Sequence, residues 1–391
     1  MYDSFTAHLK KGQYTTERKE FFDGRNTKLI NGRFDVGSSF VSRVREQARK
    51  NKKYYPVISL SERTFGSYKT EKRKEEILEI QMSMPKARYE TNKYEIDQND
   101  YGFIARKGVD YLGMAGISTS TDNFKNAILD KLDICKSITL PPYFGITEQV
   151  IKKLSPFNYK PKSDFRCGYY DSNSGGIFIK FYNPIRGWVV YCKYSEILNN
   201  GYTLVEEEIK RQVLTGIQPK NLIRFELSLQ TKQSLEAVLR RFIPNKKKGF
   251  TLNDVFTNGN ISQKILLEEF DKIYNPLSIT LITLSEMKES QLDYILRNKI
   301  NNLKDRALMS YLVNMTTKIG LAKTLELAKR ETSNSSYERI KKSLPKIRQE
   351  LGEIDETTLN LIEFLRGELV KFELIKPEVE KGHCQPLLIE I

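Results

Sequence analysis

The chain has 391 residues, of which 64 are lysine or arginine and 49 are aspartate or glutamate, so its formal net charge is +15. This length accommodates about two or three domains, and so basic a chain suggests a polyanionic partner, nucleic acid before an anionic membrane. No apolar run approaches the ~20 residues that span a bilayer, and the first residues lack the apolar core of a secretory signal. These features argue against membrane and secreted proteins and predict a cytoplasmic one.

Histidine and cysteine are scarce and scattered. The two histidines, His8 and His383, lie at opposite ends of the chain, and the four cysteines form no CxxC pair. We therefore expect no zinc site, no disulfide framework and no catalysis by a Ser-His-Asp or Cys-His set. Any metal site must rest mainly on carboxylates, which favours Mg²⁺ or Mn²⁺. The sequence also lacks the glycine-rich motifs of ATP-driven motors and dinucleotide enzymes.

Residues 1–75 are mixed and strongly basic in places. The densest run, RVREQARKNKK from Arg43, fits either a solvated helix face or loop, or a patch that follows phosphates. Glu79–Met84 alternates as a strand does, and Pro85–Tyr94 after it is basic, aromatic and loop-like.

Asp122–Leu129 is predicted to be helical, and residues 130–138 are predicted to form a strand. Alternation along this strand puts Lys131, Asp133 and Cys135 on one face. Because aspartate is depleted in strands, Asp133 fits either a turn former at a strand end or a functional carboxylate.

Residues 175–198 form the central stretch of the sequence. Two segments rich in β-branched and aromatic residues, Ile177–Tyr182 and Trp188–Tyr194, flank the turn-forming sequence NPIRG, which predicts a hairpin. In the second strand, alternation places Val189, Tyr191 and Lys193 on one face. A tyrosine two residues before a lysine fits a phosphate-attacking nucleophile beside a cation, and equally an ordinary strand tyrosine beside a solvated lysine.

Thr203–Leu214 is predicted to be a helix and Asn221–Gln230 a strand with almost ideal alternation. Glu226 lies in the middle of that strand, on its polar face. It fits either a surface glutamate of a half-exposed sheet or a functional carboxylate.

From Ser234 the periodicity is helical, and the break at Phe242–Gly249 indicates a domain boundary near residue 245. Pro345 is expected to break or kink the helical run Ser333–Leu351. Leu369–Leu374 reads as a short strand, and helices followed by such a strand fit a winged-helix DNA reader or simple helical packing. The predicted fold class is α+β, with an antiparallel-sheet domain at residues 1–245 and a mainly helical domain at residues 246–391.

Five segments resemble, in the same order, motifs of the filamentous bacteriophage replication initiators, the gene II protein family, and more loosely the rolling-circle initiators of small plasmids. The segments are SMPKARYETNKY (Ser83–Tyr94), LDKLDICKSI (Leu129–Ile138), VVYCKYSEIL (Val189–Leu198), LIRFELSL (Leu222–Leu229) and SSYERIKKSLPKIRQELGEID (Ser335–Asp355). Lys131 stands where the family usually has arginine, and a glutamate before Ile354 shifts the last motif by one residue. The paired metal-binding histidines of better-known initiators are absent here.

The resemblance implies a site-specific DNA nickase that starts rolling-circle replication. Tyr191 would attack a backbone phosphodiester at the origin, stay linked to the 5′-phosphate and release a 3′-OH, and the strand could be rejoined without ATP. A phenol with an ordinary pKa of about 10 is a poor nucleophile at neutral pH, so Lys193 is the cation expected to assist it.

The resemblance also suggests residues for metal and DNA binding. Asp133 and Glu226 are the candidate ligands of Mg²⁺ or Mn²⁺, Glu196 is a weaker candidate as ligand or base, and Asp3 is a more remote one. Arg224 is expected either to contact phosphate or to pair with a carboxylate. The remaining DNA-binding candidates come from the first and last motifs: Lys86, Arg88, Tyr337 and Arg339.

The expected partners are double-stranded origin DNA and the displaced single strand, together with a host replicative helicase, and no membrane. Two other classes fit the sequence. One is a non-catalytic origin-binding protein, whose sheet is purely structural. The other is a mobilisation relaxase, which shares the tyrosine chemistry but acts at a transfer origin.

Overall fold

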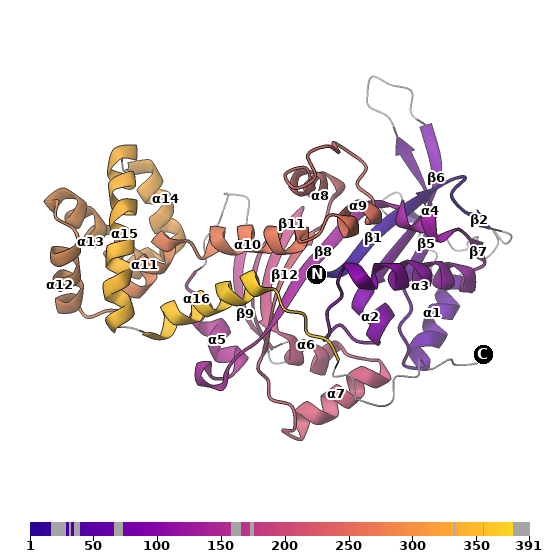
Figure 1. Ribbon diagram of the computed structural model, residues 1–391, viewed down its shortest axis with the longest axis horizontal. Coiled ribbons are helices and arrows are strands. Elements are labelled where there is room, and N and C mark those ends of the chain that lie inside the picture. Colours follow the sequence, from indigo (N-terminus) through magenta and orange to yellow (C-terminus); the bar gives the residue numbers. More distant parts are fainter. Residues whose placement is uncertain are drawn as a thin grey trace.

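The computed structural model describes residues 1–16, 29–30, 33–34, 40–65, 73–157, 166–172, 176–331, 333–354 and 356–377. Its strands are β1 (Tyr2–Lys10), β2 (Thr15–Thr16), β3 (Leu29–Ile30), β4 (Arg33–Phe34), β5 (Val57–Phe65), β6 (Arg73–Ser83), β7 (Ile117–Ser118), β8 (Ile128–Thr139), β9 (Arg166–Ser172), β10 (Gly176–Asn183), β11 (Arg186–Cys192) and β12 (Leu222–Leu229). Eight of them form one antiparallel sheet in the order β5-β6-β1-β8-β12-β11-β10-β9, at the centre of the molecule (Figure 1). The predicted α+β class is confirmed.

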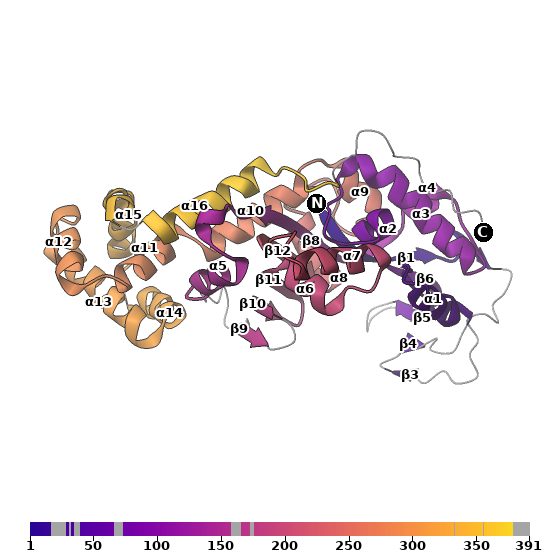
Figure 2. The same ribbon diagram turned by 90° about the horizontal axis from the view of Figure 1, so that it is seen from below.

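The helices are α1 (Phe40–Lys50), α2 (Met84–Tyr89), α3 (Tyr101–Met114), α4 (Thr121–Lys125), α5 (Thr147–Leu154), α6 (Lys193–Asn200), α7 (Leu204–Leu214), α8 (Lys232–Leu239), α9 (Leu252–Thr257), α10 (Ile261–Ile273), α11 (Pro276–Ser285), α12 (Glu289–Lys299), α13 (Leu303–Ile319), α14 (Leu321–Glu331), α15 (Asn334–Ile354) and α16 (Glu356–Lys371), with short 3₁₀ turns at Gln98–Asp100 and Pro142–Phe144. Helices α11 to α15 gather at one end of the molecule, beyond the sheet, in both views (Figure 1, Figure 2).

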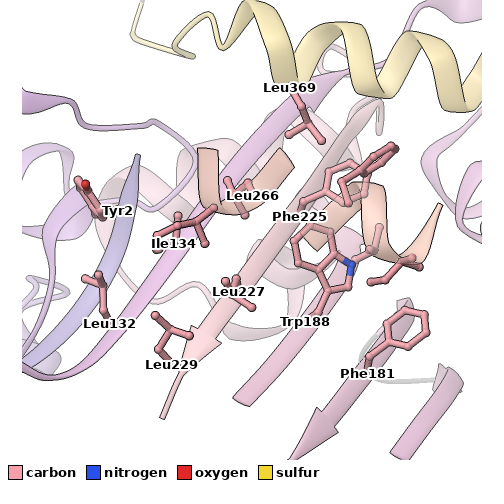
Figure 3. Packing of buried hydrophobic residues seen from close by; sticks show 14 of the residues in the cluster. Tyr2, Leu132, Ile134, Phe181, Trp188, Phe225, Leu227, Leu229, Leu266 and Leu369 are labelled. Atoms are coloured by element: carbon pink, nitrogen blue, oxygen red, sulfur yellow. The ribbon is translucent and has the colours of Figure 1, made fainter. Parts of the chain in front are cut away.

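Alternation along the strands gives the central sheet one apolar face. In β12, Phe225 and Leu227 are fully buried, and Leu227 pairs with Trp188 of β11 on one side and Ile134 of β8 on the other. A slip of one residue would carry every one of these side chains to the opposite face, so their burial specifies the register. Figure 3 shows this apolar layer, with Leu266 of α10 and Leu369 of α16 close to Phe225.

The chain after the predicted boundary near residue 245 first completes the cover of the sheet. Phe250 is fully buried, and its carbonyl accepts a hydrogen bond of 2.8 Å from the backbone N–H of Leu129. Helix α10 then packs on β8 and β12, α11 to α15 follow, and α16 returns to pack on α10 and β8. Helices that follow the predicted boundary therefore cover part of the apolar face.

Two local predictions are wrong, and of the break or kink predicted at Pro345 the break does not occur. The segment after Ser83 begins with helix α2, because Pro85 occupies its first turn, where a missing N–H costs nothing. Pro345 does not end α15, in which Leu344 and Ile347 are buried on either side of it. The expected strand at Leu369–Leu374 is instead the last turn of α16 and the segment after it. No described residue after β12 belongs to a named strand, and no described helix has the length and apolarity needed to cross a membrane.

We predict that Phe225→Ala lowers the free energy of unfolding by about 3–5 kcal/mol. The ring is fully buried, with centroids 5.8 Å from Trp188 and 5.7 Å from Phe270, so its loss leaves a cavity between sheet and α10. Leu214→Ala is the control, because Leu214 is 76% exposed. Urea unfolding measures both, and equal effects of the two substitutions would contradict this packing.

Candidate functional site

The polar face of the sheet brings three of the predicted site residues together. Tyr191 of β11 pairs with Arg224 of β12, and Glu226 follows two residues later on the same face. Asp133 of β8 pairs with Ser228, the next residue of β12 on this face. Tyr191, Glu226 and Asp133 are all half-buried. Adjacent antiparallel strands thus place a phenol and two carboxylates on one partly open surface.

The Tyr191 hydroxyl donates a hydrogen bond of 2.9 Å to Oε2 of Glu226. Burial, and then the Glu226 carboxylate, raise the pKa of Tyr191 well above 10. Burial, followed by repulsion from Asp3 and Asp133, raises the pKa of Glu226 to about 7. At neutral pH the phenol is therefore protonated, and its acceptor can take up a proton.

Asp133 is held by two serine hydroxyls from the neighbouring strands. Ser4 of β1 donates to Oδ2 and Ser228 of β12 donates to Oδ1. Burial nevertheless raises the pKa of this carboxyl, and the charge of Asp3 adds to the effect. Asp133 and Glu226 therefore crowd negative charge on one face without an intervening cation of their own.

Arg224 is completely buried, and its side chain connects three segments of the chain beneath this face. Its guanidinium donates to Ser137 Oγ at 2.8 Å, to Asp3 Oδ1 at 3.1 Å and to the carbonyl of Asn92. Asp3 lies at an irregularity in the β1–β8 register, which is how a residue on β1 reaches a side chain of β12. Of the two roles expected for Arg224, the structure shows the pairing with a carboxylate.

Lys193 does not lie on the strand face with Tyr191, because β11 ends at Cys192 and Lys193 opens α6. Its ammonium group is fully buried, 5.6 Å from the centre of the Tyr191 ring, and donates to Glu196 Oε2 at 2.6 Å. Desolvation and then the charge of Arg224 lower the pKa of Lys193. Burial alone would raise the pKa of Glu196, but the interaction with Lys193 outweighs it and the pKa is lowered. Glu196 is thus engaged by Lys193 rather than by the other carboxylates.

The candidate metal ligands do not form a closed set. In the part of the chain that the structure describes, no three histidine, cysteine, aspartate or glutamate side chains converge closely enough to hold an ion by themselves. Asp133 and Glu226 remain as two mutually repelling carboxylates on one face, whereas Glu196 is hydrogen-bonded to Lys193.

The predicted DNA-binding residues are divided between two regions. Lys86 of α2 is mostly buried and pairs with Glu206 at 2.9 Å, and the guanidinium of Arg88 lies 4.1 Å from the centre of the Phe103 ring. In the helical group, Arg339 makes two hydrogen bonds of 2.9 and 3.0 Å to Asp305, and the Tyr337 ring lies beneath Lys341 at 4.7 Å. Each therefore has a structural partner, and they do not form one surface.

Sequence reasoning missed the two serines that hold Asp133. Ser228 could have been found, since it continues the polar alternation of β12 two residues after Glu226. Ser4 gave no such signal, because its approach to Asp133 depends on β1 pairing with β8 across 129 residues. In comparisons with known proteins, no family model, no curated protein and no solved structure matches the chain.

We predict that Arg224→Met lowers the free energy of unfolding by about 3–5 kcal/mol, because Asp3, Ser137 and the Asn92 carbonyl lose their common partner inside the protein. Arg240→Met is the matched control, since Arg240 is about half exposed and its nearest carboxylate, Glu236, is 3.7 Å away. Chemical denaturation with urea compares them. A cost for Arg224→Met as small as that of the control would mean that the buried network does not hold the face together.

Glu226 should also make stability depend on pH. Its folded-state pKa of about 7 exceeds its ordinary value of 4.5, so between these values the folded protein holds a proton that the unfolded chain releases. The free energy of unfolding should therefore fall as the pH rises from about 4.5 to about 7, by up to about 3 kcal/mol. Glu226→Gln should remove that part of the decline and stabilise the protein at pH 8. Melting temperatures measured against pH in EDTA test this, and parallel profiles for the two proteins would refute it.

Proposed function

We propose that this protein is a rolling-circle replication initiator, a metal-dependent nickase that cuts one DNA strand at an origin and links itself to the 5′ end through Tyr191. The observation that carries the proposal is the hydrogen bond from the Tyr191 hydroxyl to Glu226, on a sheet face shared with Asp133. The order of the five sequence motifs supports the same reading.

The chemistry assigned to the chain's own residues is a transesterification. The Tyr191 oxygen attacks the phosphorus, its proton passes to Glu226, and the bond from phosphorus to the 3′ oxygen breaks. That oxygen leaves as the 3′-OH, taking a proton from solvent, and the strand stays bound as a phosphotyrosine ester that a later 3′-OH can attack. When no cation is bound to it, Glu226 has a pKa of about 7, which suits it to accept a proton near neutral pH. The buried charge of Arg224 favours a phenolate on Tyr191, and Lys193 lies 5.6 Å from the centre of its ring.

Asp133 and Glu226 fit Mg²⁺ or Mn²⁺. Their mutual repulsion, which contributes to the raised pKa of Glu226, is the kind of strain that a divalent cation relieves. Mg²⁺ is commonly held by one or two protein carboxylates, with water and phosphate oxygens as its other ligands, so a third protein carboxylate is not required. When bound, the ion would neutralise charge on the non-bridging phosphate oxygens.

The partners included in the proposal are origin DNA, its displaced single strand and a host replicative helicase. The net charge of +15 supports a polyanionic partner.

The test uses supercoiled DNA of the replicon that encodes the chain, with Mg²⁺ or Mn²⁺. Tyr191→Phe should lose nicking and covalent attachment by roughly 10³-fold or more while still binding the DNA, because only the attacking oxygen is removed. Tyr182→Phe is the control, since Tyr182 is a half-buried tyrosine of β10 on the same sheet face. Gel electrophoresis after denaturation separates nicked and protein-linked DNA.

Full nicking and attachment by Tyr191→Phe would overturn the assignment of the nucleophile. Binding without any nick by the wild-type protein would favour a non-catalytic origin-binding protein instead. Nicking confined to a transfer origin would favour a mobilisation relaxase.

A further inference from the structure

One strongly basic surface is not used by the site described above. We define the α1 surface as Arg45 and Arg49 of α1, Lys53 in the turn that follows, and the ring of Tyr202 between α6 and α7. All three cationic side chains are exposed, and Tyr202 is half-buried. Arg49 lies 5.8 Å from the centre of the Tyr202 ring. Helices α1 and α7 both lie on the lower right of the molecule in Figure 1.

Among the residues that the structure describes, the cations of the α1 surface have no carboxylate partner in an ion pair. Two neighbouring lysines do form ion pairs: Lys50 pairs with Glu46 at 3.0 Å, and Lys52 pairs with Glu207 at 2.7 Å. Arg45, Arg49 and Lys53, in contrast, form no ion pair with any carboxylate of the described residues. The surface therefore offers three positive charges to an external anion.

Several contacts and one longer-range charge interaction link the α1 surface to Tyr191. Lys86 lies 4.7 Å from the centre of the Tyr202 ring and pairs with Glu206, and its charge helps to lower the pKa of Glu196, the partner of Lys193. The segment after α2 follows the same path. The Glu90 carbonyl accepts from Thr203 Oγ1, next to Tyr202, and the Asn92 carbonyl accepts from Arg224.

We propose that the α1 surface binds the sugar-phosphate backbone of single-stranded DNA whose chain continues toward Tyr191. The direction of the strand toward Tyr191 rests on the proposed function. The binding of a polyanion by the α1 surface rests only on the charge of that surface. Exposed arginine and lysine beside an aromatic ring are the usual composition of a groove for single-stranded nucleic acid. A separated strand also fits better than a duplex, because Tyr191 and Glu226 are half-buried on the sheet face and the phosphate must come down to them.

The test measures binding of a fluorescein-labelled oligothymidylate to the full chain carrying Tyr191→Phe, in EDTA, over a range of salt concentrations. Three substitutions on the α1 surface, Arg45→Gln, Arg49→Gln and Lys53→Gln, should weaken binding and reduce the slope of log K against log salt by about 2, at ~0.7 per phosphate contact. The control removes the same charge from exposed lysines of α13 and α14 by Lys304→Gln, Lys318→Gln and Lys323→Gln, and should leave the slope unchanged.

Replacing Arg45 and Arg49 by lysine, with Lys53 retained, should restore most of the slope and so separate charge from folding. Equal losses in the two triple variants would show an effect of net charge alone and overturn the proposal. So would an unchanged slope in the α1 variant, or a loss confined to a DNA hairpin duplex. Because Tyr191→Phe and EDTA remove the chemistry, a failure of the proposed nicking activity would leave this measurement unaffected.

Discussion

The apolar face of the central sheet sets the positions of all the side chains on its other face. Phe225 lies between Trp188 and Phe270 in this layer, and with its neighbours it fixes how β8, β12 and β11 pair. Once that register is fixed, the pairing of residues on the opposite face is fixed as well. Tyr191 must lie opposite Arg224, and Glu226 must lie within reach of its hydroxyl. The geometry of the site follows from burial on the other side of the same strands.

Among the described residues of this face, the buried cations are paired with carboxylates, whereas two further carboxylates are not paired with cations. The buried cations, Arg224 and Lys193, each have a carboxylate partner, Asp3 and Glu196. In the described part of the chain, neither Asp133 nor Glu226 forms an ion pair, and repulsion between neighbouring carboxylates adds to burial in raising their pKa values. Crowded carboxylates of this kind reduce stability and are found where ions or protons are handled. Under the proposed function, the Tyr191 phenol bound to Glu226 would pass its proton to that carboxylate as it attacks.

Alternation in the sequence was enough to place Tyr191, Asp133 and Glu226 each on one face of its own strand, because side chains of a strand repeat every second residue. That the three faces coincide depends on the pairing of β8, β12 and β11. Alternation failed at Lys193, since periodicity does not show that β11 ends at Cys192 and that a helix begins at the next residue. The sequence suggested Asp3 only as a remote metal ligand, and neither its pairing with Arg224 nor the complete burial of Arg224 could be predicted. They depend on an irregular β1–β8 pairing and on the Asn92 carbonyl, which is 132 residues away in the chain. The local sequence pattern thus predicted which residues lie on the polar faces of the strands. Which side chains these residues bind depends on contacts between distant parts of the chain, which the pattern does not show.

The most direct test of the central claim is to identify the attachment site in the wild-type protein. The protein would be incubated with its own replicon DNA and Mn²⁺, digested with nuclease and protease, and the peptides examined by mass spectrometry. We predict a nucleotide on Tyr191 and on none of the other tyrosines among the 21 in the chain. A nucleotide on a different tyrosine would keep the reaction class but contradict the site. Specific DNA binding without any modified peptide would contradict the claim itself, and Asp133 and Glu226 would then be ordinary residues of a structural sheet.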